Sequence, residues 1–228
     1  MKLIRKLFFI ILILFIFACS IIFLIGKSYY NHQLKKESLI ARVSNITSQK
    51  NFVKFEDMSE YYRNAVISIE DHRYYDHGPV DYISIARAFF VNIKNKELQE
   101  GGSTITQQVA KNIVFNQDRS FLRKIGELFA AYDLENNYSK KEIFELYVNT
   151  AYFGDGYYGI HDASYGYYNK SPKDLNLNES SMLAGIPNAP SVYSPSVNPD
   201  LAKKRQSLVI NSLIEYGYIT EDDALFIK

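Results

Sequence analysis

The sequence predicts an all-α, mainly helical domain behind a single N-terminal transmembrane helix. Residues 7–26 contain no charged side chain, residues 80–171 contain no proline, and apolar residues recur at helical spacing in several segments. Proline interrupts helix interiors, so its absence leaves the long central segment free to be helical. Strand-like alternation of apolar and polar residues is scarce.

The apolar segment at residues 7–26 is long enough to cross a bilayer. At about 1.5 Å per residue, a helix of this length spans roughly 30 Å, the thickness of the hydrocarbon core. A cleaved signal peptide usually has a shorter apolar region, and a lipoprotein site at Cys19 fits poorly because Phe17 is bulky. Basic residues flank both sides, so charge does not decide the topology. We expect a short cytoplasmic end and the transmembrane helix over residues 1–26, a polar stem over 27–50 and a globular domain over 51–228.

The composition narrows the class of function. The chain has 26 basic and 25 acidic residues and a formal net charge of +1, which gives no electrostatic case for binding nucleic acid. Its single cysteine excludes an intrachain disulfide framework and a Cys-rich zinc site.

Capping residues and apolar periodicity predict the individual helices. Asp81 can begin one helix, Ser120 a second, and the pair Ser139 and Glu142 has the spacing of a capping box that begins a third. Their apolar faces would contain, in order, Ile85, Phe89 and Ile93; Phe121, Ile125, Leu128, Phe129 and Tyr132; and Ile143, Leu146, Tyr147, Thr150 and Ala151. We expect a loop-rich stretch from about 185 to 200 and a last helix from about 200 to 216.

The first cluster of candidate functional residues begins with Glu70 and Asp71, which end an apolar run. Adjacent residues on a helix point about 100° apart, so the two carboxylates cannot face one ligand, and we expect one to be catalytic and the other structural. The alternative is a solvated helix end followed by a polar loop. His72 and His77 could suggest a metal site, but no third ligand follows at a recognised spacing, so we predict no metal.

Residues 101–112 form the most informative segment. A helix with its N-cap at Ser103 would gather Thr104, Gln107, Gln108 and Lys111 within about a third of its circumference. Amides pair with sugar hydroxyls and lysine pairs with phosphate, so this stripe suits a polyhydroxylated, negatively charged ligand. An ordinary exposed helix face is the alternative.

Three cations precede a second candidate carboxylate, Glu127: Arg119, Arg123 and Lys124. An exposed ion pair between Arg123 and Glu127, one helical turn apart, is the alternative to a functional site. Gly126 argues against it, because a mid-helix glycine costs about 1 kcal/mol relative to alanine and often marks a close approach. Three cations near one carboxylate can bind a pyrophosphate and hold that carboxylate ionised.

Together these segments resemble motifs of the peptidoglycan glycosyltransferases of glycosyltransferase family 51, specifically the monofunctional biosynthetic type related to the transglycosylase domain of class A penicillin-binding proteins. The family's first motif, E-D-x-x-F-x-x-H-x-G, corresponds to Glu70, Asp71, Tyr74, His77 and Pro79, and its second, S-T-I-T-Q-Q-x-x-K-N, is present in full at residues 103–112. The third motif, R-K-x-x-E, corresponds to Arg123, Lys124 and Glu127. The fourth, K-x-x-I-L-E-x-Y-L-N, corresponds to Lys140, Ile143, Phe144, Glu145, Tyr147, Val148 and Asn149. A weaker arginine motif resembles residues 205–210. The resemblance covers about residues 53–213, and the departures from the motifs are Tyr74, Pro79, Phe144 and Val148. No Ser-x-x-Lys tetrad occurs in the sequence, so the chain resembles the monofunctional type without transpeptidase activity.

The resemblance implies a lysozyme-like fold of two lobes with a cleft between them, lipid II as the substrate, and a β-1,4-linked glycan product with release of undecaprenyl pyrophosphate. It implies Glu70 as the general base and Glu127 as a group that positions cations or assists departure of the pyrophosphate. The implied substrate-binding residues are Lys111, Arg119, Arg123 and Lys124 for the pyrophosphate and Ser103, Thr104, Gln107 and Gln108 for the sugars. Glu145, Tyr147 and Asn149 are interpreted as structural, with Asn149 fixing the turn to Gly154.

The expected partners are lipid II, the growing glycan strand and membrane lipid, while transpeptidase and division-protein partners stay open. No cofactor is expected to be required, and a contribution of Mg²⁺ or Mn²⁺ stays open. The resemblance places the catalytic domain outside the cytoplasm, on a single-pass anchor. Two alternatives remain: a membrane-anchored lytic enzyme that cleaves glycan strands, and a catalytically idle membrane scaffold that recruits cell-wall enzymes. A lytic enzyme needs neither a cationic pyrophosphate site nor an anchor, and a scaffold needs neither Glu70 nor Glu127.

Overall fold

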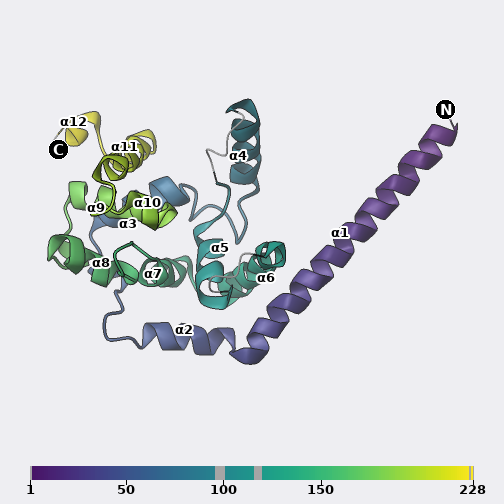
Figure 1. Cartoon of the computed structure of the whole chain (residues 1–228), viewed down its shortest axis with the longest axis horizontal. Helices are drawn as coiled ribbons and strands as arrows, with labels where there is room; N and C mark the ends of the chain where they lie inside the picture. Colours follow the sequence, from purple (N-terminus) through teal and green to yellow (C-terminus); the bar gives the residue numbers. More distant parts are fainter. Residues whose placement is uncertain (1, 96–100, 116–119, 226, 228) are drawn as a thin grey trace.

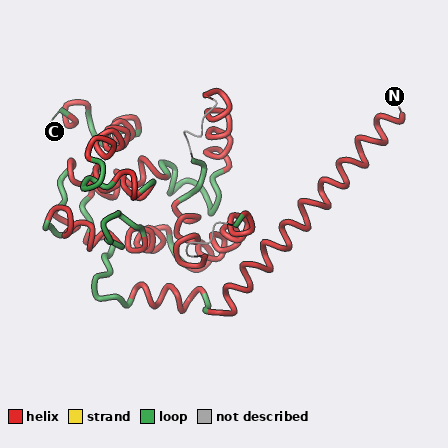
Figure 2. The backbone as a smooth tube through the Cα atoms, in the orientation of Figure 1, coloured by secondary structure: helices red, strands yellow, loops and turns green. Residues whose placement is uncertain are grey.

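The computed structural model describes residues 2–95, 101–115, 120–225 and 227. Figures 1 and 2 show helices joined by loops, and the described residues contain no strand. The closest approach to sheet pairing there is an isolated antiparallel bridge between Tyr152 and Tyr158. The predicted all-α fold is confirmed.

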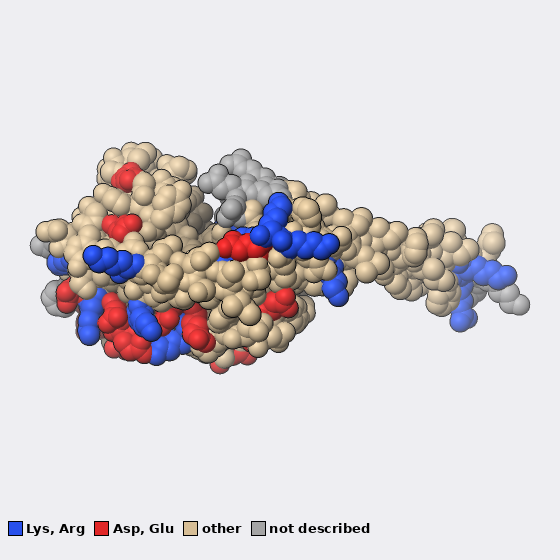
Figure 3. Space-filling view, turned by 90° about the horizontal axis from the view of Figure 1, so that it is seen from below, with Lys and Arg blue, Asp and Glu red and all other residues tan. Residues whose placement is uncertain are grey.

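The first helix, α1 (Lys2–Lys36), leaves the rest of the chain as a long rod (Figure 1). Its apolar side chains are mostly exposed, and among the described helices it is the one that is long and apolar enough to cross a membrane. On the face shown in Figure 3, charged side chains lie at the free end of this rod and where it meets the domain, with an uncharged stretch between them. One N-terminal helix can therefore anchor the chain in a bilayer.

The segment expected to be a polar stem, residues 27–50, is instead mostly helical and packed. Helix α1 continues through Lys36, and Ser38 then caps α2 (Leu39–Thr47) by accepting a hydrogen bond from the Ala41 N–H. Tyr30, Leu39 and Val43 are buried in the core. The end of α1 packs against α6, and α2 packs against α7. These partners are distant in sequence, so local periodicity could not reveal the packing.

Ten further α-helices follow α2 in the described residues. Their bounds are α3 (Glu60–Glu70), α4 (Tyr82–Asn95), α5 (Ile105–Ala110), α6 (Phe121–Asn137), α7 (Lys140–Thr150), α8 (Gly159–Tyr168), α9 (Leu177–Gly185), α10 (Pro190–Tyr193), α11 (Pro199–Glu215) and α12 (Glu221–Ala224). Short 3-10 turns occupy Phe55–Asp57, Pro172–Asp174 and Ile186–Asn188, and a π-helical turn occupies Lys111–Phe115. The last long helix begins and ends within a residue or so of the prediction, whereas α12 was not predicted.

The helices pack in two groups that position the site. Helices α3, α9 and α11 pack against one another, while α5 packs against α6 and α7. Both groups contribute to one buried apolar cluster, which includes Val66 and Leu183 from the first group and Val109 and Leu146 from the second. Glu70 is the last residue of α3, and α5 and α6 carry the polar residues predicted to act with it.

The capping predictions are confirmed for all three helices. Ser120 accepts a hydrogen bond from the Arg123 N–H at the start of α6, and Ser139 and Glu142 form the predicted capping box of α7. Asp81 likewise accepts from the Ile83 and Ser84 N–H groups where α4 begins.

The apolar face predicted for α4 is not buried. Ile85, Phe89 and Ile93 are exposed, and so are Ile83 and Phe90 beside them. Figure 1 shows α4 projecting from the domain, which explains this exposure. The helix was predicted correctly, but its apolar face is exposed instead of packed in the core.

Candidate active site

Glu70 lies at the carboxyl end of α3, where Asp71 turns the chain away from helical geometry. Its side chain is only 8% exposed. The Gln108 amide donates a hydrogen bond to Glu70 Oε2 at 2.6 Å, and Arg205 Nη2 lies 3.7 Å from Oε1. The alternative of a solvated helix end is therefore wrong. Glu70 is a largely buried carboxylate with one amide and one cation beside it.

Asp71 faces away from this arrangement and has a structural role, as predicted for one of the two carboxylates. One of its oxygens accepts the Ile105 backbone N–H at 3.0 Å, and the other lies 2.6 Å from His77 Nε2. Burial opposes the charged form of His77, but the hydrogen bond and the charge of Asp71 outweigh it and raise the pKa of the imidazole. Asp71 thus ties the loop after α3 to the first turn of α5.

Asp71, His77 and Asp81 bring potential metal-ligand atoms within 4.8 Å of one another. However, Asp81 is already bonded to Arg73 and to the first turn of α4, and Asp71 is occupied as described. His72 lies outside this group and stacks on Tyr216. These contacts explain Asp71, His77 and Asp81 as side chains that link neighbouring segments of the chain.

Helix α5 begins one residue later than predicted, because its N-cap is Thr104 and not Ser103. Thr104 Oγ1 accepts the Gln107 N–H, and Gln107 Oε1 accepts the Thr104 N–H, which together make a capping box. Both residues are buried. The alternative of an ordinary exposed helix face is therefore wrong for these two residues, and Gln108 and Lys111 are the half-buried members of the predicted stripe. Ser103 lies outside the helix and accepts a hydrogen bond from Lys124 Nζ at 2.8 Å.

Glu127 lies on α6 and is only 2% exposed, so the alternative of an exposed ion pair is wrong. Its Oε1 lies 3.1 Å from Arg123 Nε, an ion contact without hydrogen-bond alignment, and its Oε2 accepts from Lys124 Nζ at 3.0 Å. The two cations are 24% and 47% exposed, so both can also face a ligand. A side chain at Gly126 would come within 2.7 Å of the Phe115 ring, which is the close approach that this glycine suggested.

Lys111 is influenced by the charges of both carboxylates. It begins the π-helical turn after α5, one helical turn beyond Gln108. Burial lowers the pKa of its ammonium group; the charges of Glu127 and Glu70 oppose this shift, and those of Arg123 and Lys124 add to it. The charges of Glu70, Glu127 and the cations of α6 therefore all act on Lys111. Arg119, predicted to belong with these cations, lies outside the described residues.

Arg205, on α11, is the site residue to which sequence reasoning assigned no role. Its Nε donates to the Gly185 carbonyl, and its guanidinium lies 5.9 Å from the centre of the Tyr193 ring. A side chain at Gly185 would come within 3.0 Å of Arg205 Cγ. The weak arginine motif at 205–210 was the available signal, but no local pattern indicated that α11 delivers this arginine to Glu70.

Two of the residues interpreted as structural in α7, Glu145 and Asn149, fit that interpretation. Asn149 pairs through its amide with both backbone groups of Val53, and the Glu145 carboxylate accepts the Phe55 N–H. Asn149 therefore holds the 53–55 segment, and not the predicted turn to Gly154. Tyr74, which replaces the family's phenylalanine, donates its hydroxyl to the Lys140 carbonyl at 2.5 Å.

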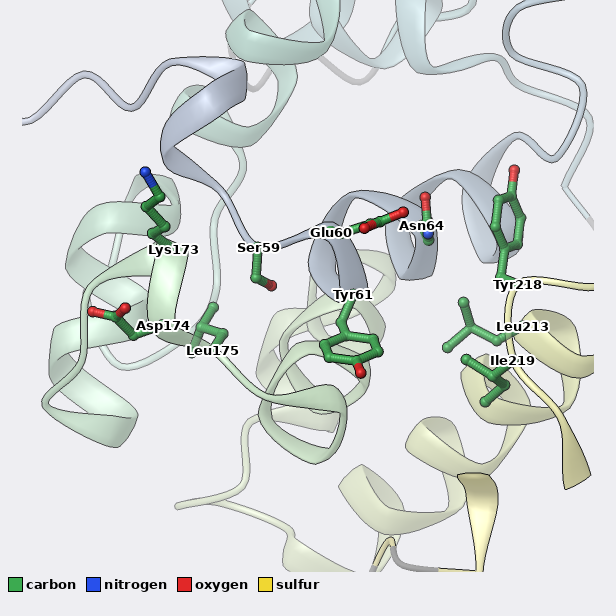
Figure 4. Close-up of a pocket in the computed structure, with 10 residues that line it drawn as sticks. All are labelled: Ser59, Glu60, Tyr61, Asn64, Lys173, Asp174, Leu175, Leu213, Tyr218 and Ile219. Carbon is green, nitrogen blue, oxygen red and sulfur yellow. The ribbon is translucent and has the colours of Figure 1, made fainter. Parts of the chain in front are cut away.

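A separate surface hollow lies between the start of α3 and the end of α11 (Figure 4). It has a volume of about 500 Å³ and includes Glu60, Tyr61, Lys173 and Tyr218 in its lining. None of the predicted site residues lines it. The hollow is therefore separate from the Glu70 site.

The Glu127 environment does not fit a divalent cation. Both carboxylate oxygens face cationic side chains at 3.0–3.1 Å, and Lys111 adds a further positive charge nearby. Such surroundings favour an anionic ligand over a metal ion. The geometry thus combines a buried carboxylate with a neighbouring cluster of lysine and arginine side chains.

Comparisons with known proteins agree with the motifs. The model of the Transglycosylase family matches residues 36–214. The chain is 46% identical over 172 residues to penicillin-binding protein 1A of Neisseria flavescens, covering 75% of this chain and 22% of that protein. It is 43% identical over 179 residues to penicillin-binding protein 1F of Bacillus subtilis (strain 168), covering 78% of this chain and 25% of that protein. The matches thus span about a quarter or less of these relatives. The chain belongs to the transglycosylase family, glycosyltransferase family 51.

Proposed function

We propose that this protein is a peptidoglycan glycosyltransferase that polymerises lipid II into β-1,4-linked glycan strands and releases undecaprenyl pyrophosphate. The observation that carries the proposal is the continuity of α5 and the turn after it. Gln108 binds Glu70 Oε2 at 2.6 Å, and Lys111, one helical turn further on, interacts with the charges of both Glu70 and Glu127. A base and a set of cations are thus available to one substrate.

In the proposed reaction, Glu70 takes the proton from the sugar 4-hydroxyl as that oxygen attacks the anomeric carbon of the donor. The bond from the anomeric carbon to the pyrophosphate breaks in the same step, and the pyrophosphate leaves as an anion. The departing pyrophosphate is stabilised by positive charge and does not need to be protonated. Lys111, Arg123 and Lys124 supply that charge. Glu127 holds Arg123 and Lys124 in place and supports the charged form of Lys111. Arg119 remains a proposed member of this set.

For the sugars, the proposal favours Gln108 and Ser103, whose side chains are half-buried, over Thr104 and Gln107. The proposed ligands are lipid II and the growing strand. No organic cofactor is required, and polymerisation in the presence of EDTA tests whether Mg²⁺ or Mn²⁺ contributes. Pull-down experiments, and not the site geometry, would identify transpeptidase or division-protein partners.

The proposed location is the outer face of the cell membrane, with α1 as a single-pass anchor. A substrate with a polyprenyl tail must be handled at the bilayer surface. The exposed Ile83, Ile85, Phe89, Phe90 and Ile93 of α4 offer a second apolar surface that can contact lipid. Both features support an enzyme that works against the membrane.

The experiment that tests the proposal incubates the purified full-length protein with labelled lipid II and separates the products by gel electrophoresis. We expect a ladder of glycan polymer. The same protein incubated with finished peptidoglycan should release no soluble fragments. Fragment release without polymerisation would favour the lytic enzyme, and neither activity would favour the scaffold.

A further inference from the structure

Three buried oxygen atoms without hydrogen-bond partners belong to the neighbourhood of Glu70. They are the hydroxyls of Tyr62 and Tyr147 and Oε1 of Glu70 itself. Across the described residues only two further buried side-chain atoms share this property, Arg123 Nε and Glu127 Oε1, and those two face each other at 3.1 Å. The Glu70 neighbourhood is therefore where the unexplained buried polar atoms concentrate.

The two tyrosines come from different helices. Tyr62 lies on α3, two turns before Glu70, and Tyr147 lies on α7; both side chains are fully buried or nearly so. Burial raises the pKa of each phenol far above its usual range, and the negative charge of Glu70 raises both further. Tyr62 contributes to the shift of Tyr147, and Arg205 opposes it. The charge of Glu70 thus acts on both phenols, and both stay protonated and able to donate.

Packing alone does not account for these hydroxyls. A buried hydroxyl without a partner loses its bonds to water and gains nothing in return, and phenylalanine would fill nearly the same volume without that loss. Buried polar atoms of this kind usually share an ordered water molecule that makes two to four hydrogen bonds. Two donors and one carboxylate oxygen would provide such a set.

We propose that Tyr62 and Tyr147 are positioning residues for Glu70, and that their hydroxyls hold an ordered water molecule against Oε1 while Gln108 holds Oε2. Arg205, 3.7 Å from Oε1, adds positive charge to the same oxygen. The carboxylate would then be held from both sides in one orientation, with hydrogen bonds that favour its ionised form. This inference rests on the proposed function, because an effect on Glu70 is measured as a change in the rate of lipid II polymerisation.

The test compares Tyr62→Phe, Tyr147→Phe and the double variant with the wild type, in full-length protein. The dependence of kcat/KM on pH is measured with labelled lipid II, together with thermal unfolding. We expect kcat to fall by about tenfold in each single variant with little change in KM, since a hydrogen bond to a charged group is worth about that factor. The acid limb of the profile should move to higher pH, and the double variant should lose little more than a single variant if both hydroxyls hold one water.

Tyr74→Phe is the matched control, because it removes a buried tyrosine hydroxyl that bonds to the Lys140 carbonyl and is not among the groups that sense Glu70. It should keep the wild-type pH profile. Arg205→Gln removes the positive charge beside the same oxygen, Glu70 Oε1, and should also move the acid limb of the pH profile to higher pH.

Folded Tyr62→Phe and Tyr147→Phe proteins with the wild-type profile, and with equal or higher unfolding temperatures, would overturn the inference. That outcome would leave the proposed function standing, because the wild type would still polymerise lipid II. Loss of polymerisation in the wild type itself would contradict the proposed function instead.

Discussion

The buried charge cluster on α6 makes a quantitative prediction for Glu127→Gln. The substitution keeps the size of the side chain but removes one negative charge from between two cations, and the amide NH₂ would face Arg123 or Lys124. Breaking a fully buried ion pair costs about 3–5 kcal/mol. Here Arg123 and Lys124 are 24% and 47% exposed and can turn toward water, so we expect a smaller loss of about 2 kcal/mol in the free energy of unfolding.

For a domain of this size, a loss of that magnitude corresponds to a fall of about 4–8 °C in Tm. The assay is thermal unfolding of the full-length protein in detergent, with Glu56→Gln as the matched control. Glu56 pairs with Lys141 on the surface, where both side chains are well exposed, so its loss should change stability by less than about 0.5 kcal/mol. A Glu127→Gln protein that unfolds at the same temperature as Glu56→Gln would refute the reasoning that burial makes the α6 cluster stronger.

Two further predictions concern stability. Gly126→Ala should lower Tm, because the new methyl group would lie 2.7 Å from the Phe115 ring and overpacking of about 1–3 kcal/mol exceeds the gain of about 1 kcal/mol in helix propensity; a raised Tm would contradict this. The raised pKa of His77 means that its pairing with Asp71 stabilises the fold fully below the unfolded value of about 6.5 and less as pH rises through the folded value. The stability difference between wild type and His77→Gln, measured by denaturant unfolding, should therefore be larger at pH 6 than at pH 9, and a difference that grows with pH would contradict the assignment.

Sequence reasoning was most successful where the determining contacts are local. The caps at Ser120 and Ser139 depend on side chains that bond to backbone within three residues, so their spacing was sufficient. Gly126 likewise marked the close approach of Phe115, although its partner could not be named from the sequence. Helical geometry alone also predicted that the adjacent carboxylates Glu70 and Asp71 face different surroundings, and their contacts do differ: Glu70 binds Gln108, whereas Asp71 binds the Ile105 N–H.

The predictions that failed depend on contacts between distant segments. The 27–50 segment was expected to be a stem because its apolar residues lack a regular period, yet Tyr30 and Val43 enter the core through contacts with α6 and α7. The N-cap was expected at Ser103, but it lies at Thr104, and the shift by one residue makes Gln107 part of the capping box. Conversely, the apolar face of α4 is regular but exposed, because periodicity identifies a face and not its partner.

The central claim is that Glu70 is the base of a polymerising enzyme whose cations lie beside it. The most direct measurement is the initial rate at which Glu70→Gln extends labelled lipid II, compared with the wild type at equal occupancy by the substrate. Because the side chain keeps its size and the cations are untouched, we predict that binding is retained while the rate falls by about 10²–10⁴-fold. A variant that binds lipid II and polymerises within tenfold of the wild-type rate would contradict the account.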